Sequence, residues 1–207
     1  EKIKVVAYGC TSGTIEIGEK RIRSEIFKAK PDALITTPIT AAVKALKLLN
    51  HKKIAVLTPY PKDVNVKVYE YLIDSGFEIK SFSSFNLNYD SEIAKVTHES
   101  LIQTISSIDL TDVDCIFVSC TALKVIDIIE ELESKLNTDI ISSNQAIIWA
   151  SLRLSIILDI RLILATFVPL VLPAVMAFWI TIPRCLKFWR KVCVIPTYSA
   201  AALTMTI

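Results

Sequence analysis

The stretch VVAYGCTSGT, residues 5–14, joins an apolar run to a polar Cys-Thr tip, and CIFVSCTALK, residues 115–124, repeats that order. In both, short β-branched apolar runs predict a buried strand. The Cys-Thr pair lies where each strand ends, and the residues after it predict the start of a helix. A chain that twice passes from a buried strand through Cys-Thr into a helix is organised as strand-and-helix units.

The same alternation runs through most of the chain. Strands are predicted at 3–9, 32–37, 54–58, 77–85, 114–120 and 139–143, and helices at 15–29, 38–50, 62–75, 97–108, 121–136 and 144–154. Pro38 and Thr97 mark two helix starts, and Gly76 marks a helix end. Short apolar strands that alternate with helices predict an α/β fold, in which helices cover both faces of parallel sheets.

A second repeat suggests two related halves. ITTPITAAV, residues 35–43, and LTPYPKDV, residues 57–64, both end a strand in Thr-Pro and lead into a helix. A duplicated α/β unit would give two similar lobes that face each other. We therefore expect a first lobe at 1–51 and a second lobe at 52–154.

The charge distribution separates these lobes from the end of the chain. Residues 1–154 carry 18 Lys and Arg against 20 Asp and Glu, a net charge of −2. Residues 155–207 carry 5 basic residues and 1 acid, a net charge of +4. The lobes lack the basic surface that a nucleic-acid partner requires, so we expect no nucleic-acid binding.

The tail at 155–207 contains an apolar segment. Residues 162–182 are 21 uncharged residues, which is long enough to cross a bilayer. Two interpretations stay open. The tail is an aberrant C-terminal sequence, which we favour, or it is a membrane anchor.

The cysteines point to a reducing compartment. The chain has five, an odd number, at positions 10, 115, 120, 185 and 193. No secretory signal opens the chain, and free thiols are typical of the cytoplasm, where we expect this protein.

Polar residues gather at the predicted strand ends. In open α/β sheets, ligands bind beyond the carboxyl ends of the strands. Five polar tips fall there: Cys10-Thr11-Ser12, Thr37-Pro38, Thr58-Pro59-Tyr60, Cys120-Thr121 and Ser142-Ser143-Asn144. Helix starts suit carboxylates and lower the pKa of a neighbouring thiol.

Two such thiols could act on opposite faces of a carboxylate. One would remove a proton and the other return one, or one would add to a double bond, and neither scheme needs a metal or an organic cofactor. A single cysteine at a strand end is often only a small apolar residue, and Cys115, in mid-strand, is interpreted as core. No histidine pair has metal-ligand spacing, and no glycine-rich phosphate loop is present.

At this point the motifs resemble a known family. The quoted stretches around 5–14, 35–43, 57–60 and 115–124, together with SSNQAIIWASLRL at 142–154, are similar to the Asp/Glu racemase superfamily. They fall closest to the branch of maleate cis-trans isomerase, arylmalonate decarboxylase and the ectoine-utilisation protein, above all the last. The resemblance is collinear over residues 3–154.

The resemblance implies a fold and two thiols. Its fold is two flavodoxin-like lobes related by a pseudo-twofold axis, with a cofactor-independent site between them. By motif match, Cys10 is the thiol of the first lobe and Cys120 that of the second. Because both are present, the one-cysteine pattern of the decarboxylase does not fit.

The resemblance also implies substrate-binding residues. Thr11 and Ser12 would lie in a carboxylate-binding loop, and Tyr60 would donate a hydrogen bond to a substrate carboxylate. Thr121 would support the loop of the second thiol. Asn144 either contributes to the site or caps the helix that follows.

The resemblance starts at the strand before Cys10, whereas the family has a further strand–helix–strand–helix segment. We therefore expect a truncated first lobe. The expected function is a two-cysteine isomerase or racemase of a small carboxylate, which in an ectoine-utilisation protein would serve ectoine degradation. The alternatives are an inactive pseudoenzyme or carboxylate-binding module, and a protein tethered to a membrane through 162–182. A homo-oligomer is left open.

Overall fold

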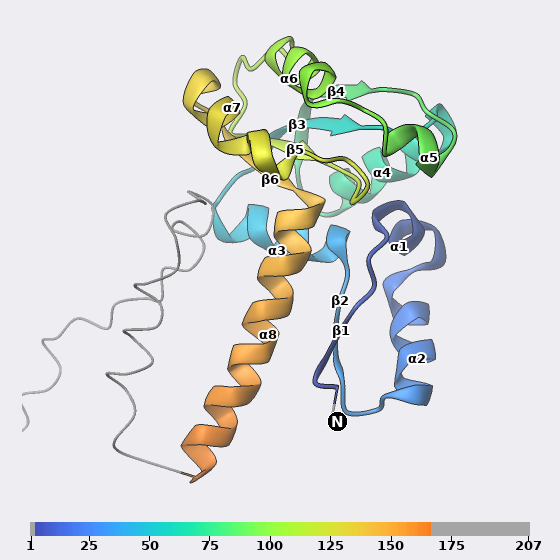
Figure 1. Ribbon diagram of the computed structural model, residues 1–207, viewed down its shortest axis with the longest axis vertical. Coiled ribbons are helices and arrows are strands. Elements are labelled where there is room, and N and C mark those ends of the chain that lie inside the picture. The colour runs from blue at the N-terminus through green and yellow to red at the C-terminus, as the bar shows by residue number, and fades with distance from the viewer. Residues whose placement is uncertain (1–2, 167–207) are drawn as a thin grey trace, which may run out of the picture.

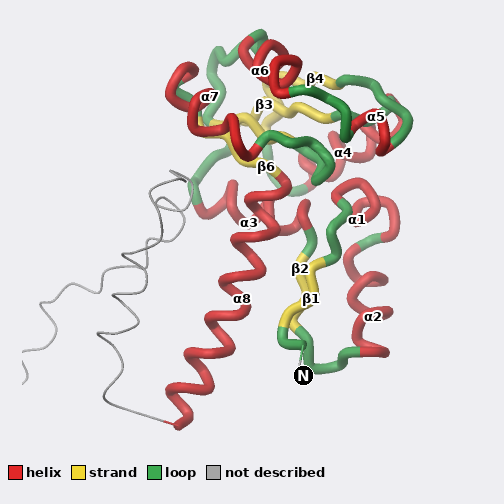
Figure 2. The backbone as a smooth tube through the Cα atoms, viewed as in Figure 1, coloured by secondary structure: helices red, strands yellow, loops and turns green. Residues whose placement is uncertain are grey.

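The structure is a computed structural model that describes residues 3–166, with side chains described as far as Ser155. Its strands form two parallel sheets with helices packed around them (Figures 1 and 2). The first sheet pairs β1 (Val5–Ala7) with β2 (Leu34–Thr36). The second sheet has the strand order β4-β3-β5-β6. The predicted α/β class with two parallel-sheet lobes is confirmed, and the first lobe is the smaller one.

The remaining elements follow the predicted alternation except for α5, a short helix that the sequence pattern does not predict and that lies between β4 and α6. The strands of the second sheet are β3 (Lys53–Thr58), β4 (Glu78–Ser84), β5 (Cys115–Val118) and β6 (Asp139–Ser142). The helices are α1 (Thr11–Ile17), α2 (Glu19–Ala29), α3 (Pro38–Leu48), α4 (Lys62–Asp74), α5 (Asp90–Ile93), α6 (His98–Ser106), the 3₁₀ helix η1 (Ile126–Ile128), α7 (Ile129–Leu136) and α8 (Ser143–Thr166).

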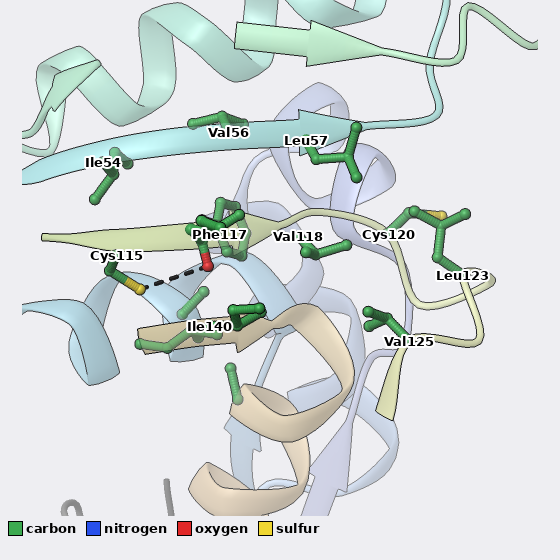
Figure 3. Close-up of a cluster of buried hydrophobic side chains, with 14 of the residues drawn as sticks. Ile54, Val56, Leu57, Cys115, Phe117, Val118, Cys120, Leu123, Val125 and Ile140 are labelled. Atoms are coloured by element: carbon green, nitrogen blue, oxygen red, sulfur yellow. Dashed lines mark hydrogen bonds between the residues drawn. The ribbon is translucent and has the colours of Figure 1, made fainter. Parts of the chain in front are cut away.

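The core lies around the two central strands of the second sheet. Val56 of β3 is in register with Phe117 of β5, and both side chains are fully buried (Figure 3). Each side chain of this size stabilises the fold by roughly 1.5–3 kcal/mol when it leaves water. β4 pairs on one side only among the described strands and is only partly buried, so it is an edge strand of this sheet.

Local capping explains where several helices begin and end. The Thr37 hydroxyl accepts the Thr40 N–H, and Pro38 occupies the first turn of α3. The Thr97 hydroxyl accepts the Ser100 N–H at 3.2 Å and starts α6. Gly76, with a φ of 92°, follows the end of α4. These three predicted boundaries are confirmed.

Two predicted helices differ from the observed ones. Residues 15–29 are not one helix, because Gly18 has a φ of 86° and separates α1 from α2. Residues 121–125 are not helical, and helix begins only at Ile126. Cys120 has a φ of 101°, which takes the chain out of the strand in a left-handed turn. The prediction that a helix starts beside Cys120 is therefore wrong.

Helix α8 connects the two sheets. It starts at the end of β6 in the second sheet and runs along β1, β2 and α3 (Figure 1). The division of the chain into lobes at 51 and 154 stays a prediction. Helix α8 contacts elements of both lobes, namely β1, β2 and α3 of the first and β6 of the second.

Little of the predicted tail falls within the described residues. The segment at 162–182 lies outside them except for the backbone of 162–166, and Cys185 and Cys193 lie outside them as well. Within the part of the chain that the structure describes, no helix combines the length and the apolar character that a membrane span requires.

An ion cluster ties the loop before β5 to two strands. Asp112 contacts Lys53 of β3 at 2.6 Å and Lys80 of β4 at 2.8 Å. Hydrogen bonds from these two lysines hold the pKa of the Asp112 carboxyl at about 2, below the usual value of 3.8.

We predict that Asp112→Asn lowers the free energy of unfolding at pH 7 more than at pH 2. A carboxyl with a lowered folded-state pKa stabilises the fold above its unfolded pKa, and this contribution is lost as the pH falls through the folded pKa. Urea unfolding at both pH values measures the difference. The control is Asp74→Asn, which removes an exposed charge that has no ion pair among the described residues. Equal pH dependence of the two variants would contradict the prediction.

Candidate active site

The two Cys-Thr loops meet between the sheets. The Thr11 hydroxyl, just after Cys10, donates to Ser143 Oγ at 3.1 Å. Ser143 Oγ also accepts the backbone N–H of Cys120, again at 3.1 Å. In the other direction, the Thr121 hydroxyl donates to the carbonyl oxygen of Gly9 at 2.7 Å. Hydrogen bonds between residues more than a hundred positions apart in the chain therefore keep the two Cys-Thr loops together.

Cys10 has the position that the sequence predicts. It is the residue before the first turn of α1, and its sulfur accepts the Gly13 N–H at 3.3 Å. The Ser12 hydroxyl lies 3.9 Å from the same sulfur. Cys10 is exposed, so a molecule arriving from solvent can reach it.

Gly13 leaves the room that the Cys10 sulfur occupies. A Cβ at this position would lie 2.9 Å from the Cys10 sulfur and 2.9 Å from the Tyr8 hydroxyl oxygen. Because both are ends of side chains, they can move, and the sulfur is one of the two groups that a side chain at 13 would displace. A glycine at 13 therefore fixes the position of the first thiol.

Cys120 lies in a different environment. It is 7% exposed, and its sulfur accepts the Ala122 N–H at 3.4 Å. Burial raises the pKa of the Cys120 thiol, while the hydrogen bonds from Ala122 and from the Tyr60 hydroxyl lower it in part. The expectation that a helix start lowers the pKa of this thiol is wrong, because no helix starts here and desolvation dominates.

The Tyr60 side chain lies beside the second thiol, that of Cys120. Its side chain is buried, and its hydroxyl accepts a long hydrogen bond of 3.5 Å from the Ser119 hydroxyl. Burial and the neighbouring Cys120 sulfur raise the pKa of the Tyr60 phenol, so the phenol stays protonated and can donate. Its backbone is fixed, because its carbonyl accepts from Asn65 and from Ser84 at 2.7 Å each.

Asn144 shapes the loop that carries the second thiol. Its amide nitrogen donates to the carbonyl oxygens of Thr121 at 3.1 Å and Leu123 at 3.3 Å. These two carbonyls are thereby bonded to α8 instead of to a helix of their own. The cap of α8 is made elsewhere, by Ser142 and Gln145. Of the two alternatives for Asn144, the cap is therefore not observed, and a contribution to substrate binding stays a prediction.

The structure thus brings most of the predicted residues together. Thr11, Tyr60, Cys120, Thr121 and Asn144 are linked by the contacts above, and Ser12 lies beside Cys10. Thr11 is buried and gives its hydroxyl to Ser143, so its predicted contact with a carboxylate stays a prediction.

Two contributors were not singled out from the sequence. Ser143 and Ser119 are both fully buried. Ser143 lies in the polar tip at 142–144, and that position at a strand end is the only signal of its role in the sequence. Its importance depends on contacts with residues 11 and 120, which are distant in the chain.

Cys115, the remaining cysteine of the described residues, belongs to the hydrophobic core. Its side chain is fully buried, and its thiol donates to the Ile116 carbonyl oxygen at 3.5 Å (Figure 3). Burial raises the pKa of Cys115 well above its usual value. In the described part of the chain, no group of three His, Cys, Asp or Glu side chains is placed to hold a metal ion.

Comparison with known proteins places this geometry among related folds. A family model described as arylmalonate decarboxylase matches residues 19–161. The chain is 23% identical to maleate isomerase of Nocardia farcinica over 158 residues, which are 72% of this chain and 63% of that protein. It is 28% identical to arylmalonate decarboxylase of Bordetella bronchiseptica over 122 residues, which are 58% of this chain and 51% of that protein.

Solved structures share the fold. One is a Nocardia farcinica maleate cis-trans isomerase in which a cysteine is replaced by serine, with a covalently bound succinylcysteine intermediate. It has a TM-score of 0.68 and 23% identity, and the match covers 73% of this chain and 65% of that one. The chain therefore spans just under two thirds of the maleate isomerases it matches.

We predict that Cys120 is alkylated slowly near neutral pH and that its rate rises at higher pH than that of a free thiol. The thiolate is the reacting species, and burial raises the Cys120 pKa. Iodoacetamide labelling across pH, mapped by peptide mass spectrometry, measures this rate. In Tyr60→Phe, the profile should move further toward high pH because a hydrogen bond to the sulfur is lost. A profile at or below that of glutathione would contradict the prediction.

We also predict that Gly13→Ala changes the alkylation rate of Cys10 while the melting temperature stays the same or rises. Alanine favours the helix by about 1 kcal/mol over glycine, whereas its Cβ displaces the sulfur. The exposed Ser24→Ala in α2 is the control for a general effect of alanine. An unchanged alkylation rate of Cys10 would contradict the prediction, because it would show that a side chain at position 13 does not affect the sulfur.

Proposed function

Because this chain belongs to the arylmalonate decarboxylase family, we propose that it is a cofactor-independent enzyme in which Cys10 and Cys120 isomerise or racemise a small carboxylate. The observation that supports this most is the meeting of the two cysteine loops, held by hydrogen bonds from Thr11 and Thr121. A thiol on each side of one position is what a two-cysteine mechanism needs.

We propose different roles for the two thiols. Cys10 is exposed and lies where substrate arrives, so it is the nucleophile. Cys120 is buried, and its raised pKa keeps it protonated near neutral pH, so it is the proton donor. A thiol that is protonated near neutral pH can donate its proton as a general acid.

For an unsaturated dicarboxylate such as maleate, the steps balance as follows. The Cys10 thiolate forms a C–S bond to one alkene carbon, and the π electrons pass to the other carbon, which takes the Cys120 proton. The carbon–carbon bond is now single and rotates. The Cys120 thiolate then removes a proton, the double bond reforms and the C–S bond breaks. No oxidant or cofactor is consumed.

The substrate carboxylates need donors. The Ser12 hydroxyl lies near Cys10, and the Tyr60 phenol lies near Cys120. We propose that these two groups bind one carboxylate each, with backbone N–H groups at the start of α1. The buried Thr11 contributes through the loop that it holds.

The presence of both thiols in this chain favours isomerisation over decarboxylation. A succinyl group on a cysteine, as in the Nocardia farcinica structure, is what thiol addition to maleate would leave. A racemase, a role in ectoine degradation and a cytoplasmic location remain narrower proposals of the same scheme. A chain that spans 63% of a relative could also bind a carboxylate without turnover. The membrane-tethered alternative depends on 162–182, beyond the described side chains.

We predict that the chain converts maleate to fumarate and that Cys10→Ser and Cys120→Ser each lower kcat by at least about 100-fold, since serine is a far weaker nucleophile and acid. Proton NMR in deuterated water measures both conversion and deuterium uptake. The control is Cys115→Ala, a change to a cysteine outside the site, which should keep kcat within about twofold.

Three outcomes separate the candidates. Conversion that depends on Cys10 and Cys120 supports the isomerase. Maleate binding in calorimetry without conversion or deuterium uptake would favour the binding module. Equal activity in all three cysteine variants would overturn the two-thiol scheme.

A further inference from the structure

The threonine after each cysteine forms a hydrogen bond with a residue of the opposite lobe. Thr11, in the first lobe, reaches the backbone of Cys120 through Ser143 Oγ. Thr121, in the second lobe, reaches the carbonyl oxygen of Gly9, directly before Cys10. The repeated Cys-Thr pair therefore has a reciprocal geometry, in which Thr121 donates directly to the first loop and Thr11 donates to Ser143, which in turn accepts from the second loop.

We propose that Thr11, Thr121 and Ser143 are positioning residues whose cross-lobe hydrogen bonds set the position of each thiol from the opposite lobe. Their consequence for catalysis rests on the proposed function. Their effect on the two loops does not.

Ser143 has contacts that fit this role. Its side chain is fully buried at the end of β6, and its oxygen accepts from both Thr11 and the Cys120 N–H. A buried backbone N–H without an acceptor is costly, so Ser143 determines where the Cys120 backbone can lie. At that point Cys120 has a φ of 101°, a conformation that a non-glycine residue keeps only when its surroundings enforce it.

The start of α8 does not require Ser143. Ser142 performs that task, because its hydroxyl accepts the Gln145 N–H at 3.1 Å and its own N–H donates to Gln145 Oε1 at 3.0 Å. These reciprocal bonds form a capping box. The adjacent serine is therefore a matched control, since it is equally buried and acts on α8 instead of on a cysteine loop.

The reciprocal geometry has a testable consequence. Removal of the Thr11 hydroxyl should loosen the Cys120 loop, and removal of the Thr121 hydroxyl should loosen the Cys10 loop. A threonine that only supported its own turn would loosen the loop in which it lies. The effect on the opposite lobe thus separates a cross-lobe role from a local one.

The experiment uses the full chain with Thr11→Val, Thr121→Val, Ser143→Ala and Ser143→Thr, and Ser142→Ala as the control. Hydrogen exchange with mass spectrometry follows the backbone at 8–15 and 117–124, and iodoacetamide labelling follows Cys120. Ser143→Ala should speed exchange at 117–124 and Cys120 labelling by at least about fivefold, the scale of a lost bond to a buried group. Ser143→Thr keeps the hydroxyl and should restore most of the protection.

The cross-lobe variants decide the proposal. Thr11→Val should speed exchange at 117–124, and Thr121→Val should speed exchange at 8–15. Ser142→Ala should lower the melting temperature and speed exchange at the start of α8 without the same change in Cys120 labelling. Effects confined to the mutated loop, or equal Cys120 labelling in Ser142→Ala and Ser143→Ala, would overturn the proposal.

These readouts need no substrate. If the chain does not convert maleate but the opposite loops respond, the proposed function fails and the cross-lobe hydrogen bonds keep their role. If the chain converts maleate and the opposite loops do not respond, only the positioning role fails.

Discussion

The hydrogen bonds between the two Cys-Thr loops are the constraint on which the site depends. Each sheet ends in a polar tip, but a sheet alone cannot orient its tip toward a second sheet. Thr121 and Ser143 supply that orientation through short contacts to the first loop. Further from the tips, α1 packs on α4 and Glu16 forms an ion pair with Lys67. This exposed pair adds little by itself, since screening by water weakens it. Of the two contacts at the tips, the Thr11–Ser143 bond is buried and the Thr121–Gly9 bond is exposed, so the buried bond carries more of the specificity of the arrangement.

The same sequence motif gives two thiols with different surroundings. Cys10 precedes a helix and is exposed, whereas Cys120 leaves its strand in a left-handed turn and is 7% exposed. The turn arises because Asn144 takes the carbonyls of Thr121 and Leu123, which would otherwise accept helical bonds. The repeated motif thus has two different backbone conformations although its residues are alike. This difference in exposure is the basis of the two roles proposed for the thiols.

Much of the fold follows from local sequence. The strands around Val56 and Phe117 were predictable because a buried parallel strand is a short β-branched run, and the helix starts at Pro38 and Thr97 because caps act within one turn. The turn at 121–125 was not predictable, because the periodicity after it is helical and its cause lies in α8. Ser143 was missed for the same reason. Its role comes from partners that are near only after folding, and a single sequence contains no signal of such contacts.

Helix α8 explains how residues that are distant in the chain reach hydrogen-bonding distance of one another. Its first turn holds Ser143 and Asn144 against the Cys120 loop, while its body packs along β1, β2 and α3 (Figure 1). Any shift of the first sheet along this helix would move Ser143 relative to Thr11, and the 3.1 Å bond between them would lengthen. The position of the first sheet relative to the start of α8 is therefore constrained twice. Apolar packing along the helix constrains it, and so does the buried hydrogen bond between Thr11 and Ser143. Apolar packing tolerates small displacements of the elements, whereas a hydrogen bond weakens steeply as its distance and angle change. The polar contact thus fixes the position of Thr11 relative to Ser143 within the range that packing allows.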